Sequence, residues 1–276
     1  MPQRFVCLPA VALLCFAAAA PGCGGDSGGS SGGGPPSGGP LATAEPKEVL
    51  SASARAMARV PGYHIEGTQT DREGTTRVTG DVTAAGGARL RFAGDRMDLA
   101  MIVAGTELYM KAPGAFWRAR TPGATGDKLA SLLGDKWVRA PGTADDQLRS
   151  VIDDLLPRTL AHCLPKEEGT IENLGARTVD GRRVVVLRSK GDAPGGAPGE
   201  LTVSATGEPL PLRVRQTGRT KPGGVRDPRC DDKDDSTTRS DIRLSGFDRV
   251  APIRPPKHVV DIDRLQQDGS GATVQS

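Results

Sequence analysis

The amino-acid sequence predicts an α+β domain in which one large antiparallel sheet curls around helices. Period-two alternation places Met97, Leu99, Met101 and Val103 on one face of a strand, as in a sheet with a single apolar side. The order of the predicted elements is one helix, a run of strands, two helices and a second run of strands. Strands followed by segregated helices are typical of the α+β class.

The first predicted helix covers residues 46–59, because apolar residues recur within it at helical spacing and Pro46 suits a first turn. Pro61 and Gly62 end it. Three strands follow, separated by turns that contain glycine: 63–70, 75–83 and 88–93. Gly105 and Thr106 then turn the alternating strand back into a returning strand that begins with Leu108 and Met110. These short connections predict a meander.

Two helical segments interrupt the strands. The first covers residues 127–133, and the second covers 145–162, where Pro157 is expected to produce a kink. Thr143 and Asp146 resemble a capping box at the start of the longer helix. Its apolar side consists of Leu148, Val151, Ile152, Leu155, Leu156 and Leu160.

A second run of strands begins after these helices. Asp180 and Gly181 form a hairpin turn between two of its strands. Residues 221–236 are rich in Gly, Pro and Asp and are predicted to be a loop. The strands expected in this run are 169–174, 177–179, 183–189, 200–205, 212–217, 237–247 and a short one at 259–262.

The amino terminus resembles an export signal that ends in a lipobox. Arg4 precedes an uncharged apolar run over residues 6–20, which is too short to span a bilayer, where about 20 residues are needed. Ala20-Pro21-Gly22-Cys23 resembles the box in which the cysteine receives a diacylglycerol, although leucine is usual where Ala20 stands and Pro21 is uncommon. The alternative is ordinary secretion with an incidental cysteine. A Gly/Ser-rich tract directly after Cys23 favours the lipoprotein, because it is typical of a flexible tether.

These features divide the chain into four parts. Residues 1–22 are the signal peptide, and 23–43 are the lipidated cysteine and its tether. Residues 44–265 are the folded domain, and 266–276 are a disordered tail. We therefore expect a domain on the extracytoplasmic face of the cell membrane, held there by acyl chains on Cys23.

The cysteines predict a disulfide in that compartment. Of the five cysteines, Cys7 and Cys15 leave with the signal and Cys23 is lipidated, so Cys163 and Cys230 remain as an even pair in an exported protein. The alternative is a Cys163 nucleophile activated by His162. Adjacent residues on a helix point about 100° apart, which disfavours that pairing.

Composition and motifs exclude several classes of function. The formal charge is +3, with 36 basic and 33 acidic residues mixed along the chain, so nucleic-acid binding is not expected. His64, His162 and His258 lie far apart in the sequence, without metal-ligand spacing, a nucleophile elbow or a phosphate loop. The acidic run Asp231, Asp232, Asp234 and Asp235 is interrupted by Lys233 and favours a solvated loop over a cation site. We expect no catalytic residue, no metal and no cofactor.

Several phrases, in this order, resemble actinobacterial lipid-binding lipoproteins of the LppX/LprG type, which share the LolA/LolB-like fold. They are "YHIEGTQTDREGTTRVTGDVT", "AGTELYMKAPGAFWRA", "KWVRA", "TVDGRRVVVLRS", "ATGEPLPLRVR" and "RVAPIRPPKHVVDIDRL". The heavy use of Ala, Gly, Pro, Arg and Asp also indicates a GC-rich, actinobacterial genome. The resemblance spans residues 45–265 and implies a half-open antiparallel β-barrel of about 10–11 strands around helices. Neither the cysteine pair nor the acidic loop is part of it.

The resemblance also implies a hydrophobic cavity for lipid or glycolipid between the sheet and the helices. The alternative is that the same residues only pack against the longer helix. A monomer that binds or transports lipid, or a lipidated molecule, is the expected function; a non-catalytic adaptor or sensor that binds a protein through the same groove is the alternative. The predicted cavity-lining residues are Leu90, Phe92, Met97, Leu99, Met101, Val103, Leu108, Met110, Val151 and Leu155.

Overall fold

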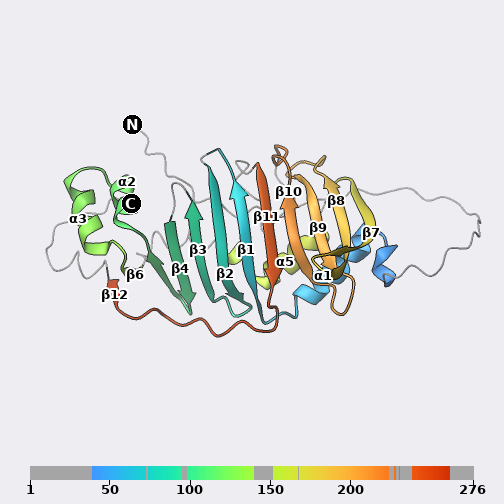
Figure 1. Cartoon of the computed structure of the whole chain (residues 1–276), viewed down its shortest axis with the longest axis horizontal. Coiled ribbons are helices and arrows are strands. Elements are labelled where there is room, and N and C mark those ends of the chain that lie inside the picture. The colour runs from blue at the N-terminus through green and yellow to red at the C-terminus, as the bar shows by residue number, and fades with distance from the viewer. Residues whose placement is uncertain are drawn as a thin grey trace, which may run out of the picture. The chain divides into compact units, whose positions relative to one another are not determined.

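The protein contains one twelve-stranded sheet that does not close, together with helices (Figure 1). The strand order is β12-β6-β5-β4-β3-β2-β1-β11-β10-β9-β8-β7, so β12 and β7 are the two edges. The computed structural model describes residues 39–72, 74–94, 98–139, 152–166, 168–223, 227, 230 and 238–261. The predicted α+β class and large half-open sheet are confirmed, with twelve strands in place of the expected 10–11.

The described residues form two compact units. The first takes residues 60–157 and those from 242 onward, and the second takes 39–59 and 158–241. The strands of the first unit are β1 (Gly62–Thr70), β2 (Thr75–Thr83), β3 (Ala88–Gly94), β4 (Asp98–Ala104), β5 (Glu107–Lys111), β6 (Trp137–Arg139) and β12 (Val259–Asp261). Those of the second are β7 (Ile171–Val179), β8 (Arg182–Lys190), β9 (Pro198–Ser204) and β10 (Pro211–Gln216), and β11 (Arg239–Ser245) contributes to both.

The meander in the first unit follows the prediction closely. Strands β1 to β6 pair in sequence order and antiparallel, and β2 begins and ends at the predicted residues. In contrast, β12 pairs with β6 in parallel, with Val260 beside Val138. From β1 to β6 all neighbouring strands are therefore antiparallel, and the β12–β6 pair at the edge of the sheet is parallel.

Two helices follow β5 in the first unit. The α3 helix (Ala124–Leu133) extends the predicted segment by three residues toward the amino terminus, and α2 (Gly114–Arg120) is an element that the sequence analysis did not identify. The α2 helix is two turns long and buries a single side chain, Trp117. So short a helix with one buried position carries no 3.6-residue apolar pattern to detect.

The second unit places a helix against its strands. The α1 helix (Pro46–Met57) begins at the predicted proline, and its Val49, Leu50 and Ala54 are buried in one cluster with side chains from four other elements. Those elements are the 3-10 helix η2 (Leu164–Lys166) and the strands β8, β9 and β10, through Leu164, Val185, Leu187, Leu201, Val203 and Val214. An amphipathic helix on the apolar face of antiparallel strands agrees with the α+β class that the sequence predicts.

A hairpin and a bulge shape the edge of the second unit. Asp180 and Gly181 have φ of 49° and 74°, so the β7–β8 turn has the two positive φ values of a type I′ turn, as predicted. The sequence predicts two strands where the single strand β7 runs, because Gly175 suggests an end. In the structure Gly175, with φ of 76°, lies within a register irregularity between Asn173 and Ala176, and the strand continues past it.

The longer predicted helix is interrupted at Pro157. Residues 152–154 are helical, and α5 (Pro157–Cys163) begins at the proline, which is a favourable first position because it lacks the amide proton a helix start leaves unpaired. Residues 140–151, including Thr143, Asp146 and Val151, lie outside the described residues.

The described part of the second unit includes residues that the sequence analysis assigns to the tether. A short 3-10 helix, η1 (Pro40–Ala42), is held by the side-chain amide of Asn173, which donates to the carbonyl oxygens of Leu41 and Ala44 at 3.1 and 2.7 Å. Leu41 and Ala44 also pack against the α1 cluster. Residues 39–43 therefore belong to the fold and not to the tether.

The predicted signal, Cys23, the residues from 24 to 38 and the tail from 262 onward lie outside the described residues. Within the described part of the chain, none of the helices has the length and apolar character that a membrane span needs.

Candidate functional site

The predicted cavity-lining residues lie together on one face of the first unit's meander. Seven of them are on β3, β4 and β5, and each is at most 8% exposed. Strand register joins them into three cross-strand rows: Phe92–Leu99, Leu90–Met101–Met110 and Val103–Leu108. Met97 and Val151 lie outside the described residues.

The same face continues over the neighbouring strands with residues that the sequence analysis did not assign to it. On β2, Val78 is the register partner of Phe92, and on β6, Val138 is the partner of Met110. On β1, Ile65 alternates with Tyr63 on the buried side, and all four side chains are at most 2% exposed. Period-two alternation in each strand was the signal that could have extended the list.

Tyr63 fixes a contact between this face and the segment that precedes Pro157. Its phenol is fully buried and donates a hydrogen bond to the backbone carbonyl of Leu155, and its ring lies 6.3 Å from that of Phe247. Burial raises the pKa of the Tyr63 phenol well above its ordinary range, so the hydroxyl remains a donor. Leu155 therefore covers the β1 side of the face, as the packing alternative predicts. A cavity over the remaining rows stays a prediction.

The opposite face of β4 and β5 is also covered. Ile102, Ala104 and Tyr109 form a buried cluster, against which Ile253 and Val259 pack together with Trp137. The segment after β11 thus reaches β6 and pairs with it as the edge strand β12 (Figure 1). Strand β4 therefore buries apolar side chains on both of its faces, whereas the sequence analysis expected an apolar side chain only at every second position.

The predicted disulfide is confirmed in the second unit. Cys163, the last residue of α5, is bonded to Cys230, with a Cα–Cα distance of 5.5 Å. Both residues are 5% exposed. The bond closes a loop over a sequence separation of 67 residues.

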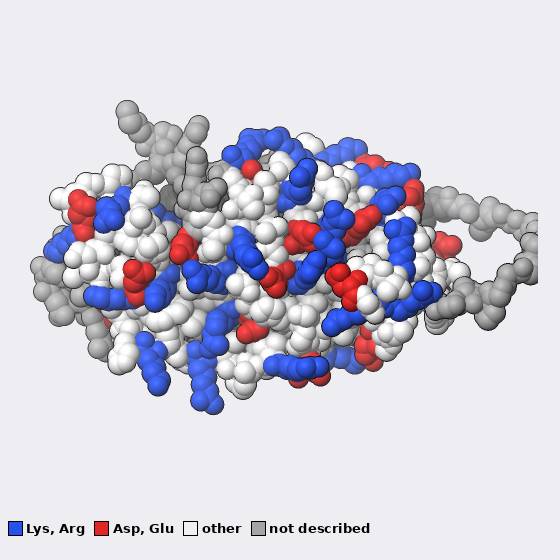
Figure 2. All heavy atoms as spheres, viewed as in Figure 1, with Lys and Arg blue, Asp and Glu red and all other residues white. Residues whose placement is uncertain are grey.

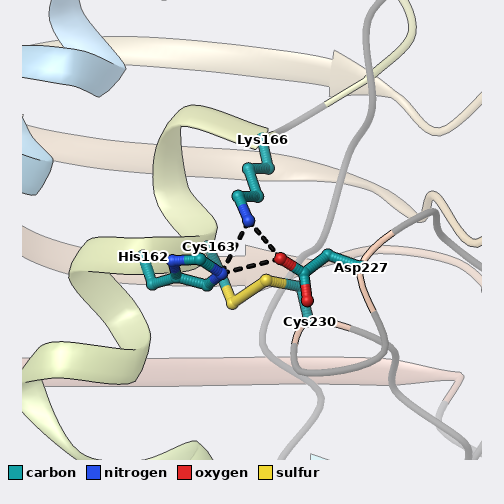
Figure 3. Close-up of a disulfide and its surroundings, with 5 residues drawn as sticks. All are labelled: His162, Cys163, Lys166, Asp227 and Cys230. Carbon is teal, nitrogen blue, oxygen red and sulfur yellow. Dashed lines mark hydrogen bonds and ion pairs between the residues drawn. A yellow bond between two sulfur atoms is a disulfide. The ribbon is translucent and has the colours of Figure 1, made fainter.

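Three polar side chains surround this disulfide (Figure 3). His162 Nε2 lies 2.7 Å from Asp227 Oδ2, and the ammonium of Lys166 contacts both atoms, at 2.6 Å from His162 Nε2. The ligand atoms of His162, Asp227 and Cys230 all lie within 4.8 Å of one another. The sequence analysis considered His162 as a partner of Cys163 and found no metal-ligand spacing around it, whereas the structure places it near Asp227 and the sulfur of Cys230.

The other two histidines, His64 and His258, belong to the first unit and have separate surroundings. His64 lies on β1, and its Nδ1 is 2.8 Å from Asp81 Oδ1 on the paired strand β2. His258 has a positive φ of 58° just before β12. The acidic run 231–235 lies outside the described residues.

Charges of both signs alternate on the surface. Figure 2 shows Lys and Arg side chains interspersed with Asp and Glu on the viewed face. In the second unit, ion pairs join neighbouring strands in the series Arg188–Glu200–Arg215–Asp241, at 3.0, 3.7 and 3.9 Å. Such part-exposed pairs contribute about 0–1 kcal/mol each. Because each arginine in this series lies next to a carboxylate, the series does not form a continuous basic surface.

No protein-family model and no curated protein sequence matches the chain. Among solved structures it is similar to LprF from Mycobacterium bovis, with 15% identity, a TM-score of 0.45, and coverage of 76% of this chain and 96% of that one. It is also similar to the lipoprotein LppX from Mycobacterium tuberculosis (12% identity, TM-score 0.42, 76% and 98% covered). A third similar structure is that of an uncharacterized conserved protein from Thermus thermophilus, with 14% identity, a TM-score of 0.33, and coverage of 78% of this chain and 98% of that one. At these scores the likeness carries no statement about function.

Proposed function

We propose that the chain is a membrane-anchored, extracytoplasmic lipoprotein that binds or transports lipid, or a lipidated molecule, on the apolar face of β1–β6. The observation that supports this most is the continuity of that face, whose three cross-strand rows present only apolar side chains. The proposed role is that of a monomer, and it needs neither a cofactor nor a catalytic residue.

The chemistry of this face suits an acyl chain. Burying hydrocarbon contributes about 0.8 kcal/mol per CH₂ group, so even a short stretch of tail is held by several kcal/mol. Met101 and Met110 are register partners at the centre of the face. Methionine has an unbranched, polarizable side chain that adapts to differently shaped partners. Because the two methionines at the centre of the face can adapt their shape, the face suits acyl chains of different lengths.

The anchor proposal depends on Cys23 and the residues around it. The lipobox-like Ala20-Pro21-Gly22-Cys23 and the Gly/Ser-rich tract after it support acylation of this cysteine. Two or three acyl chains hold a protein at the bilayer without a transmembrane helix. A Cys23→Ala variant is expected to move from the membrane fraction to the soluble extracytoplasmic fraction. Retention of that variant in washed membranes would refute the anchor.

Lipid binding is tested by native mass spectrometry of the protein purified from an actinobacterial host, followed by organic extraction and lipid identification. The expected result is one bound lipid per chain. A Met101→Gln variant should lose most of this occupancy, because an amide on the apolar face must shed its water. Arg91→Gln is the matched control: Arg91 lies on the same β3–β4 pair, faces the other side, and is exposed. Circular dichroism checks that both variants are folded.

A protein that carries no lipid and takes up no labelled phospholipid would contradict lipid binding. It would favour the second candidate, an envelope adaptor or sensor that binds a protein partner through the same groove. The contact between Tyr63 and Leu155 favours this candidate, since the chain's own segment covers part of the face.

A further inference from the structure

The disulfide and its polar neighbours contain a full set of zinc ligands. Cys163, Cys230, His162 and Asp227, here called the cysteine cluster, supply two sulfurs, a ring nitrogen and a carboxylate oxygen. Zinc takes four ligands of these types in a tetrahedron, at about 2.3 Å from sulfur and 2.0–2.2 Å from nitrogen or oxygen. Neighbouring ligand atoms are then about 3.3–3.8 Å apart. The ligand atoms of His162, Asp227 and Cys230 already lie within 4.8 Å of one another, and the sulfur of Cys163 is bonded to that of Cys230.

Lys166 gives independent evidence that this position accepts a cation. Its ammonium donates to Asp227 Oδ2 and also lies 2.6 Å from His162 Nε2. Two atoms of metal-ligating types, His162 Nε2 and Asp227 Oδ2, therefore lie 2.7 Å apart beside one positive charge and close to the disulfide (Figure 3). The side chains of His162, Lys166 and Asp227 are 30%, 39% and 18% exposed, so an ion can reach the position from solvent.

We propose that the dithiol form of the chain, in which Cys163 and Cys230 are reduced, binds one thiophilic divalent cation through the cysteine cluster, and that this cation is Zn²⁺. The disulfide is then the metal-free form, in which the Lys166 ammonium occupies the cation position. A dithiol reductant supplies two electrons and two protons to the Cys163–Cys230 bond and itself becomes a disulfide. Metal binding releases the two thiol protons, because the thiolate is the ligand. Metal occupancy and disulfide formation exclude each other, since both use the same two sulfurs.

The Lys166 ammonium distinguishes this proposal from binding by the cysteines alone. It competes with the metal for His162 and Asp227, so its removal should strengthen metal binding. Loss of either non-sulfur ligand should weaken it. A cluster that only stabilises the loop would show neither change in metal affinity.

The test uses the full-length chain with Cys7, Cys15 and Cys23 replaced by serine, so that one cysteine pair remains. The protein is reduced with a phosphine, desalted without oxygen and titrated with Co²⁺, whose visible spectrum reports tetrahedral thiolate coordination, and then with Zn²⁺ in competition. We expect one ion per reduced chain and none per oxidised chain. His162→Gln and Asp227→Asn should each weaken affinity by about 100-fold, since even an outer-shell change costs 10–100-fold. Lys166→Gln should strengthen it about two- to fivefold, the equivalent of one part-exposed ion pair.

Two results would overturn the proposal. One is the absence of Co²⁺ uptake by the reduced chain; the other is equal affinity in the starting protein and in the His162→Gln and Asp227→Asn variants. Far-UV circular dichroism monitors the fold throughout. If reduction alone unfolds the second unit, Zn²⁺ is expected to restore its spectrum, and failure to restore it would equally overturn the proposal.

Discussion

Replacing both Cys163 and Cys230 with alanine removes the only covalent cross-link among the described residues. The chain-entropy model relates the effect to loop length: for a sequence separation of 67 it gives about 4 kcal/mol of lost stability at 25 °C. The free energy of unfolding of an ordinary domain is about 5–15 kcal/mol, so the loss is a large part of the total stability. The unfolded variant is also less compact than the cross-linked chain, which should increase the urea dependence of its unfolding.

Urea unfolding of the oxidised protein and of the double variant, both in a chelator, measures this difference. All four Trp and Tyr residues, at positions 63, 109, 117 and 137, belong to the first unit, whereas far-UV circular dichroism follows both units. The unfolding transition of the double variant, followed by dichroism, should therefore move to lower urea concentration. Its fluorescence transition shows how much stability the first unit loses. A loss of less than about 1 kcal/mol would refute the loop-entropy reasoning for this bond.

Three further changes test individual features. Tyr63→Phe should lower the free energy of unfolding by about 1–3 kcal/mol, because it leaves the buried Leu155 carbonyl without its donor; an unchanged urea midpoint would argue against that hydrogen bond. Gly181→Ala should cost about 1–2 kcal/mol in thermal unfolding, and Gly181→Asn less, since φ is 74° and nothing obstructs a Cβ there; equal costs would indicate a steric cause instead. Hydrogen bonds from the Thr170 hydroxyl and amide lower the pKa of Asp192, so NMR titration should place it below the ordinary 3.9 or so, and Thr170→Val should raise it. Because the folded pKa is the lower one, Asp192 stabilises the fold above its unfolded pKa and stops doing so as pH falls through the folded pKa; a titration unchanged by Thr170→Val would contradict this cause.

Local patterns explain where sequence reasoning was accurate. Strand β2 and the Asp180–Gly181 turn were predicted because side-chain alternation and positive-φ turn residues are encoded within a few neighbouring positions. The residues of the three cross-strand rows were predicted to lie together for the same reason, whereas the register that pairs them was not predicted. The α2 helix was missed because its one buried residue, Trp117, sets no period.

Contacts between distant segments were outside the reach of those patterns. The parallel pairing of β12 with β6 joins residues more than a hundred positions apart, and no local signal names the partner. His162 and Asp227 are 65 positions apart, and no local pattern shows that they lie side by side next to the disulfide. The predicted cysteine pair was nevertheless a usable signal: the polar residues within three positions of Cys163 or Cys230 include His162, Lys166 and Asp227.

The discontinuous second unit has a consequence for the order of folding during synthesis. The α1 helix is made early, but the strands that bury its Val49 and Leu50 lie on β8, β9 and β10, more than 130 residues later. The meander from β1 to β5, by contrast, needs only contacts between neighbours in the chain, which form fast. A nascent chain can therefore complete β1–β5 while α1 still exposes its apolar side, so α1 is the segment through which a holdase chaperone would recognise the unfinished protein.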